Sequence, residues 1–220
     1  MIALAIETAT PACAVALEVD GEVTEAVLDR ERRHTEVLAP GVGRLLAAAG
    51  LAPGELERVV VDRGPGLYTG LRVGIATALG LALATGAALV EVTSLEVLAA
   101  AAARAGARGE LVALVDARRG EVFAQRFSLE GGTTALERPR VLRPEALAPE
   151  LAARPARLCG DGARRYRDAL VGAEVIDLAV PPPSAALELS RGRDPVAALT
   201  PLYLREADAV ANFSTRTRAT

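Results

Sequence analysis

One stretch of the chain has the composition of a phosphate-binding loop. It runs Gly64-Pro65-Gly66-Leu67-Tyr68-Thr69-Gly70-Leu71-Arg72-Val73-Gly74. An apolar run over 59–61 precedes it and predicts a buried strand, and an alanine- and glycine-rich segment over 75–86 follows it and predicts a helix with Thr69 as N-cap. A glycine loop between a strand and a helix often binds phosphate, because backbone N–H groups and the helix dipole favour an anion there.

The loop nevertheless lacks what phosphate chemistry needs. A P-loop ends in a Gly-Lys pair, and the sequence contains no lysine. The glycine spacing is G-x-G-x-x-x-G, one residue longer than the dinucleotide-binding fingerprint. We therefore expect neither a P-loop nor a dinucleotide site at this position.

The helix that follows the loop carries a row of small residues. Gly70, Gly74, Ala78, Ala82 and Gly86 recur at every fourth position and so share one face. Each glycine inside a helix costs about 1 kcal/mol relative to alanine, a cost that the close approach of another backbone usually offsets. That backbone belongs either to the sheet of this chain or to a helix of a partner, and the sequence leaves both possibilities open.

The same loop closely resembles the G-P-G-S-F-T-G-L-R-I-G signature of the TsaB (YeaZ) family, with Leu67 and Tyr68 in place of its serine and phenylalanine. Near the other end, residues 201–205 read P-L-Y-L-R and resemble the closing P-x-Y-L-R segment of the family. Its members are bacterial proteins needed to place threonylcarbamoyl on the adenosine beside the tRNA anticodon. The resemblance implies a role in that tRNA modification.

The segment pattern predicts an α/β or α+β protein. The first half reads β-β-β-α-β-α-β-α, with elements expected at 2–6, 13–19, 22–28, 35–50, 58–62, 75–86, 89–92 and 93–104. Thr93 and Glu96 offer a capping box for the last of these helices. Elements in the second half are expected at 111–115, 122–127, 144–153, 157–159, 163–171, 175–178 and 184–191, and the tail after Asn212 is expected to be loose.

The resemblance to the TsaB family implies an α/β fold of the actin-like ATPase (ASKHA) type with two lobes. The first lobe is expected over 1–106. The second lobe is expected over 107–220, in a reduced form whose tail could pack back on the first lobe.

The resemblance also invites comparison with active actin-like ATPases, which hold phosphates in two D-x-G turns. Glycine lets backbone N–H groups approach the phosphate oxygens there. The corresponding turns of this chain are Glu7-Thr8-Ala9 and Asp116-Ala117-Arg118, and neither has the glycine. Gly160-Asp161-Gly162, in contrast, resembles the turn that contacts the adenosine in these proteins.

Four residues remain as nucleotide-binding candidates: Thr8, Asp116, Gly160 and Gly162. Because the phosphate turns lack their glycines, we expect no cofactor and no catalytic residue in this chain. An ATPase or small-metabolite kinase that uses the cleft between the lobes is the alternative function.

The sequence offers few residues that could bind a metal or act in a peptidase. His34 is the only histidine, and the position four residues on, where TsaD relatives complete an H-x-x-x-H metal pair, is Leu38. One histidine with scattered carboxylates ligates a transition metal poorly, so we expect no metal site. The sequence also lacks H-E-x-x-H and G-x-S-x-G, which leaves a peptidase built on His34 as a weaker alternative. Cys13 and Cys159 lie in apolar runs, which predicts buried free thiols.

Charge and hydropathy limit the kinds of partner. The net charge of −3 argues against a nucleic-acid binder that works alone. The N-terminal residues lack the basic region of a signal peptide, and no apolar run reaches membrane length once its glycines, polar residues and charges are counted. We expect a cytoplasmic protein with no membrane partner that meets tRNA only indirectly or through a complex.

The resemblance implies one main partner, TsaD, which has the same fold, with the ATPase TsaE joining the pair. We expect a non-catalytic subunit that docks through the helices at 35–49 and 70–84 and forms a homodimer when alone. The expected interface residues are His34, Leu38, Leu45, Gly70, Leu71, Gly74, Ile75 and Ala78.

Overall fold

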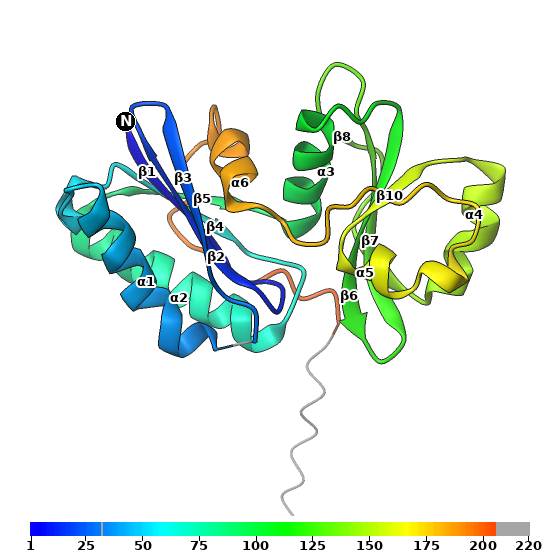
Figure 1. Ribbon diagram of the computed structural model, residues 1–220, viewed down its shortest axis with the longest axis horizontal. Helices are drawn as coiled ribbons and strands as arrows, with labels where there is room; N and C mark the ends of the chain where they lie inside the picture. Colours follow the sequence, from blue (N-terminus) through cyan, green and yellow to red (C-terminus); the bar gives the residue numbers. More distant parts are fainter. Residues whose placement is uncertain (32, 206–220) are drawn as a thin grey trace, which may run out of the picture.

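The computed structural model describes residues 1–31 and 33–205, which form two lobes, each built on a β-sheet (Figure 1). The sheet of the first lobe has the strand order β3-β2-β1-β4-β5. Its strands are β1 (Ile2–Glu7), β2 (Cys13–Val19), β3 (Glu22–Asp29), β4 (Arg58–Asp62) and β5 (Ala88–Val92). β1, β4 and β5 run parallel, whereas β2 is antiparallel to both β1 and β3. The strands predicted for this lobe are confirmed.

Helices cover both faces of this sheet. α1 (His34–Ala48) and α2 (Tyr68–Thr85) lie on one face, and α6 (Pro183–Ser190) lies on the other (Figure 1). β1 and β4 are apolar at nearly every position because both of their faces are buried. A short 3-10 turn, η1 (Pro53–Glu55), lies between α1 and β4.

α3 (Ser94–Arg104) lies between the two sheets and packs on both, through Val97 toward the first and Leu98 toward the second. It begins with the predicted capping box. Thr93 Oγ1 accepts the Glu96 N–H at 3.3 Å, and the Thr93 N–H donates to Glu96 Oε2 at 3.1 Å. α2 begins at Tyr68 without a side-chain cap, so the prediction that Thr69 caps it is wrong.

The second lobe is a smaller sheet with short helices. Its strand order is β10-β6-β7-β8, and β9 also pairs with β7. The elements are β6 (Glu110–Arg118), β7 (Glu121–Ser128), β8 (Thr134–Ala135), β9 (Arg140–Leu142), η2 (Pro144–Ala146), α4 (Leu147–Ala153), β10 (Arg157–Cys159), α5 (Asp161–Arg165) and η3 (Arg167–Ala169). The strand predicted at 175–178 is wrong, because it is reduced to an isolated bridge between Val175 and Leu158. The helix predicted at 163–171 is divided between α5 and η3.

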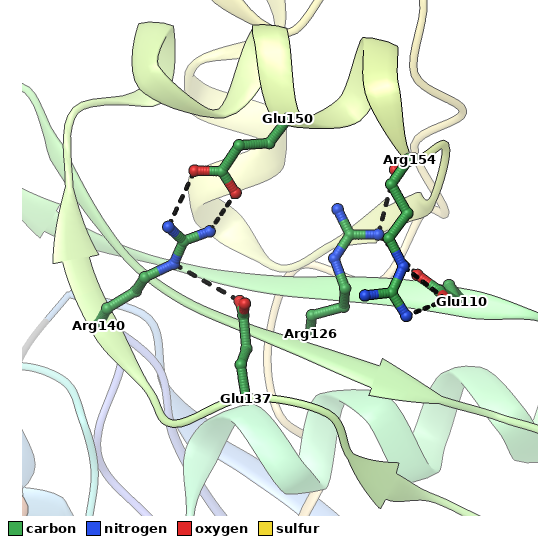
Figure 2. A network of polar contacts seen from close by, with 6 residues as sticks. All are labelled: Glu110, Arg126, Glu137, Arg140, Glu150 and Arg154. Atoms are coloured by element: carbon green, nitrogen blue, oxygen red, sulfur yellow. Dashed lines mark hydrogen bonds and ion pairs between the residues drawn. The ribbon is translucent and has the colours of Figure 1, made fainter.

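Charged side chains fasten α4 to the second sheet (Figure 2). Buried Arg126 on β7 donates through Nη1 to Glu110 Oε2 at 2.7 Å, and Arg154 donates through Nε to Glu110 Oε1 at 2.9 Å. Arg140 of β9 donates through Nη1 to Glu150 of α4 at 2.9 Å. Each carboxylate in these pairs meets an arginine, so the network helps to hold the lobe together.

After α6 the chain runs along the first lobe as an irregular segment, residues 191–205, which we call the C-terminal strap. The Val196 N–H donates to Leu89 O at 2.8 Å, and the Leu202 N–H donates to Arg63 O at 2.8 Å. Leu199 packs into the core of the first lobe between these two anchors.

The strap ends on the second lobe. Arg205 Nη1 donates to Ala117 O at 3.2 Å, and the guanidinium pairs with Glu121. α6 and most of the strap therefore pack on the first lobe, although the expected division at 106/107 assigns them to the second. The loose tail expected after Asn212 lies outside the described residues.

α2 is apolar around much of its circumference. By length and mean hydropathy the segment Tyr68–Thr85 would pass as a membrane span, against the expectation that no apolar run reaches that length. Core helices pass the same test, but only 28% of this helix is buried. α2 therefore packs one side on the sheet and leaves an apolar side uncovered.

Candidate functional site

Two carboxyl groups lie buried at the start of the glycine loop. The parallel register of β1 with β4 places Glu7 and Asp62 at neighbouring strand ends, and both are almost fully buried. Glu7 Oε1 accepts the Ala9 N–H at 2.9 Å, and Asp62 Oδ1 accepts the Gly64 N–H at 2.7 Å. Burial raises the pKa of Glu7 well above its usual value, with the Asp62 charge adding to the rise, and burial also raises the pKa of Asp62. We infer that the pair keeps a proton.

The glycine loop folds onto the turn after β1. The Leu67 N–H donates to Ala9 O at 2.6 Å, and Ser94 Oγ of α3 donates to Pro65 O at 2.9 Å. A Cβ built on Gly66 would lie 2.2 Å from the same Ala9 oxygen, so only glycine fits there. The Ala9 carbonyl thus accepts a backbone N–H at the start of α2, a donor of the kind that a phosphate-binding loop offers to its ligand.

The row of small residues on α2 lets this helix pack closely on the turn that follows β1. A Cβ on Gly70 would lie 2.0 Å from Thr8 O, and a Cβ on Gly74 would lie 2.2 Å from Thr8 Oγ1. Ala78, one turn further along, is fully buried. Of the two backbones that the sequence left open, the one that approaches α2 belongs to this chain.

The residues expected at a partner interface therefore lie inside the molecule. Leu45 is half-buried against the core of the first lobe. The other seven are buried: His34, Leu38, Gly70, Leu71, Gly74, Ile75 and Ala78. In this chain these side chains pack the inner sides of α1 and α2 on the sheet, and their contact with a partner stays a prediction.

His34 has a local role. Its Nε2 lies 3.1 Å from Thr10 O and 3.2 Å from Ala12 O, so an N–H at this nitrogen would donate to those carbonyls. Over the described part of the chain, no group of three or more His, Cys, Asp and Glu side chains could hold a metal ion. Cys13 and Cys159 are buried free thiols as predicted, and burial raises the pKa of Cys13 to about 12, which disfavours its nucleophilic thiolate.

Three of the four nucleotide-binding candidates meet in the second lobe. A Cβ on Gly160 would lie 2.0 Å from the Leu114 carbonyl oxygen on β6, and a Cβ on Gly162 would lie 3.0 Å from the same backbone. These glycines therefore let α5 pack closely on β6, on which Asp116 also lies. Thr8 is apart from them, buried in the first lobe under α2.

The Asp116 carboxylate is occupied by groups of its own lobe. Its Oδ2 pairs with Arg118 at 2.9 Å, and its Oδ1 accepts the Arg118 N–H at 2.9 Å and Tyr166 Oη at 3.2 Å. Asp161 Oδ1 accepts the Asp116 N–H at 2.8 Å, and burial raises the pKa of Asp161 to about 6. Where a phosphate turn would present open backbone, this chain has an internal ion pair.

An uncovered stripe runs along the outer side of α2. Tyr68, Arg72, Ala76, Leu79 and Leu83 follow one another at spacings of three or four residues and are all exposed. Leu79 is 37% exposed and Leu83 is 89% exposed. Neighbouring exposed leucines on one helix side indicate an interaction surface.

α1 extends this surface with small residues. Ala39, Gly43 and Ala47 are exposed at intervals of four, and α1 packs beside α2 on the same sheet face (Figure 1). We call the exposed sides of α1 and α2 together the docking face. Sequence reasoning selected the inner sides of these two helices, which pack on the sheet. A helical wheel drawn with Gly70 inward would have placed Leu83 outward.

The docking face carries a stacked cluster at the N-terminal end of α2. The rings of Tyr68 and Tyr203 stack with centroids 5.1 Å apart, and the Arg72 guanidinium lies 4.0 Å from the centre of the Tyr68 ring. Arg72 Nε donates to Tyr203 Oη at 3.1 Å. Beside the cluster lies a cleft of about 270 Å³ between the lobes, whose walls include both tyrosines, Asp116 and Arg118.

Two lobes of this topology are those of a protein of the actin-like class. The family model described as "TsaD: tRNA N6-adenosine threonylcarbamoyltransferase" matches residues 28–166. The solved structure "YeaZ from Pseudomonas aeruginosa" superposes with a TM-score of 0.80 at 30% identity and is covered over 99% of its length by 92% of this chain. The chain belongs to the TsaB (YeaZ) family and has its two-lobed actin-like fold.

Curated relatives carry the same family name. The "tRNA threonylcarbamoyladenosine biosynthesis protein TsaB" of Escherichia coli K12 is 37% identical over 144 residues, which are 64% of this chain and 62% of that protein. The protein of that name from Haemophilus influenzae is 37% identical over 120 residues, 54% of this chain and 51% of its own length. The matches therefore span less than two thirds of these two relatives.

Proposed function

We propose that this chain is a non-catalytic docking subunit in tRNA threonylcarbamoyladenosine biosynthesis, the process named for its TsaB relatives. The observation that carries the proposal is the docking face, where Leu79 and Leu83 stand exposed beside small residues of α1. Small side chains let helix backbones approach closely, and the leucines add apolar area that a partner can bury. The face therefore fits the helices of another protein.

The partner we propose is a TsaD-type subunit. The model that matches residues 28–166 carries the TsaD name, so the two chains share a fold and would present equivalent helices. Two such faces can meet about a two-fold axis, and a second copy of this chain would take the same place when the partner is absent. TsaE would join the pair, tRNA would be met through the complex, and the assembly would work in the cytoplasm.

The turns Glu7-Thr8-Ala9 and Asp116-Ala117-Arg118 support the non-catalytic part of the proposal. The Ala9 N–H of the first turn donates to Glu7 at 2.9 Å, and the Arg118 N–H of the second donates to Asp116 at 2.9 Å, so these two backbone donors are not free for a triphosphate. This arrangement disfavours the ATPase and kinase alternative. His34 beside backbone carbonyls likewise disfavours a peptidase.

The docking face is tested by Leu83→Arg, which changes an 89% exposed side chain without touching the core. We expect the affinity for the TsaD-type subunit to fall about tenfold or more, because the new charge must be desolvated when the face is covered. Size-exclusion co-elution and titration calorimetry would measure the loss.

The matched control is Val171→Arg, at an 84% exposed position of the second lobe, which should co-elute like the wild type. Far-ultraviolet circular dichroism should show the same fold for both variants. Wild-type affinity of Leu83→Arg would contradict the docking face as the site of assembly.

A further inference from the structure

Arg72 is an exposed arginine that the structure holds in one orientation. Its guanidinium stacks on Tyr68 at 4.0 Å, and its Nε donates to Tyr203 Oη at 3.1 Å. These two contacts fix the plane of the guanidinium and use its Nε edge. Within residues 1–31 and 33–205, no carboxylate forms an ion pair with Arg72, so its two terminal nitrogens remain available.

Many exposed arginines elsewhere in the described chain already hold a carboxylate. Arg33 pairs with Asp29 at 2.8 Å, and Arg191 pairs with Glu18 at 2.8 Å. Ordering a long side chain costs about 2 kcal/mol of rotamer entropy, and a guanidinium that is already ordered loses less when it binds. Arg72 therefore differs from these arginines: it is ordered by aromatic rings and still has donors to offer.

We propose that Arg72 takes a carboxylate of the partner subunit when the docking face is covered, and that Tyr203 positions its guanidinium for this contact. The inference rests on the proposed docking function. A planar guanidinium with two parallel N–H donors matches a carboxylate in bidentate geometry. Its neighbours along the stripe, Ala76, Leu79 and Leu83, are apolar and fit a protein surface better than the phosphate backbone of an RNA.

Tyr203 reaches Arg72 from a distant part of the chain, 131 residues away. The strap that carries Tyr203 is anchored on both sides of it, by the Leu202 N–H on Arg63 O at 2.8 Å and by Arg205 on Ala117 O at 3.2 Å. The guanidinium is therefore set in place only when the strap is seated.

The test measures the affinity for the TsaD-type subunit at low and at high salt. Arg72→Ala should bind about tenfold more weakly at low salt, and its affinity should depend less on salt, because a charged contact is lost. Arg72→Lys should keep the salt dependence but recover only part of the affinity, since a lysine cannot form the bidentate pair. Tyr203→Phe keeps the ring but loses the hydrogen bond, and should weaken binding about threefold.

Arg164→Ala is the matched control, because Arg164 is also exposed but lies on α5 of the second lobe. It should bind like the wild type. Wild-type affinity and salt dependence of Arg72→Ala, with Leu83→Arg still disrupting assembly, would overturn this inference and leave the docking face in place. Failure of the wild-type chain to bind the subunit would overturn both. Loss of RNA binding in Arg72→Ala with subunit affinity unchanged would assign the guanidinium to phosphate instead and overturn the carboxylate contact.

Discussion

At the scale of single residues, the role of each polar side chain is set by what already touches it. His34 faces backbone carbonyls, and Asp116 holds Arg118, so the residues that suggested chemistry are satisfied inside the chain. The sequence shows which residue types are present but not which of them are already paired. This is why the turns of Thr8 and Asp116 could be proposed from motif position, although their Ala9 and Arg118 N–H groups already donate to Glu7 and Asp116.

The buried pair of Glu7 and Asp62 predicts a dependence of stability on pH. The pKa of Glu7 is raised above its ordinary value near 4.5, so the folded state binds a proton that the unfolded state releases. The stability contribution is complete below the ordinary pKa and is lost as pH rises through the raised one. The contribution of this pair to the free energy of unfolding should therefore fall by about 1.4 kcal/mol per pH unit within that window.

Glu7→Gln removes the ionisable group and should flatten this slope, so that the variant gains stability relative to the wild type as pH rises from 4 to 8. Urea unfolding at several pH values would measure it. Glu145→Gln, at an exposed position of the second lobe, is the control and should follow the wild type. Parallel pH profiles for Glu7→Gln and the wild type would refute a shared proton.

At the scale of elements, α2 marks where sequence reasoning ends. The strands of the first lobe follow from apolar runs, and the capping box of α3 follows from Thr93 and Glu96, because these signals are local. The sequence does not predict which side of α2 faces the sheet, because both sides are small or apolar. Gly70 and Ala78 lie on one side, and Ala76 and Leu83 lie on the other. Only the tertiary contact with Thr8 selects the buried side.

The fit between α2 and the β1 turn predicts a difference between two glycines of the same helix. Gly74→Ala would place a Cβ 2.2 Å from buried Thr8 Oγ1 and should destabilise the protein by about 1–3 kcal/mol despite the better helix propensity of alanine. Gly80→Ala meets nothing within 4 Å and should stabilise it by about 0.5–1 kcal/mol. Urea unfolding monitored by circular dichroism would compare them.

A second substitution separates the clash from other effects. Thr8→Ala removes the hydroxyl that the new Cβ would meet, so the double variant of Thr8→Ala with Gly74→Ala should recover part of the lost stability. Equal stability of Gly74→Ala and Gly80→Ala would instead mean that α2 can move away from the turn without cost.

At the scale of the whole molecule, the path of the strap was the least predictable feature. The segment 191–205 has no regular secondary structure, so its sequence shows no periodicity. Its anchors join residues that are far apart in the sequence, such as Leu89 with Val196 and Ala117 with Arg205. The two lobes follow from the family resemblance. The return of α6 to the first sheet depends on burial of Ala185 and Leu187, which a short apolar segment does not reveal.

Release of the strap is predicted to precede global unfolding. Leu199→Ala removes a side chain that is buried in the first core and should lower the unfolding free energy by about 2–5 kcal/mol. Trypsin cleavage after Arg191, followed by mass spectrometry, should accelerate because the strap detaches more often. Leu136→Ala, at an exposed site of the second lobe, is the control. Unchanged cleavage in Leu199→Ala would show that the strap does not depend on this anchor.

The strap has a mechanical consequence for assembly. The backbone passes between the lobes at α3 and again before α6, and the Arg205 side chain then donates to Ala117 O of the second lobe at 3.2 Å. A hinge motion of one lobe on the other that separates Arg205 from Ala117 must therefore break this contact. With both lobes held by the strap, the chain would present a partner with one relative arrangement of the lobes instead of a range of open and closed arrangements. In the assembly proposed above, little free energy would then be spent on reorganising this chain, and more of the contact energy would stabilise the complex.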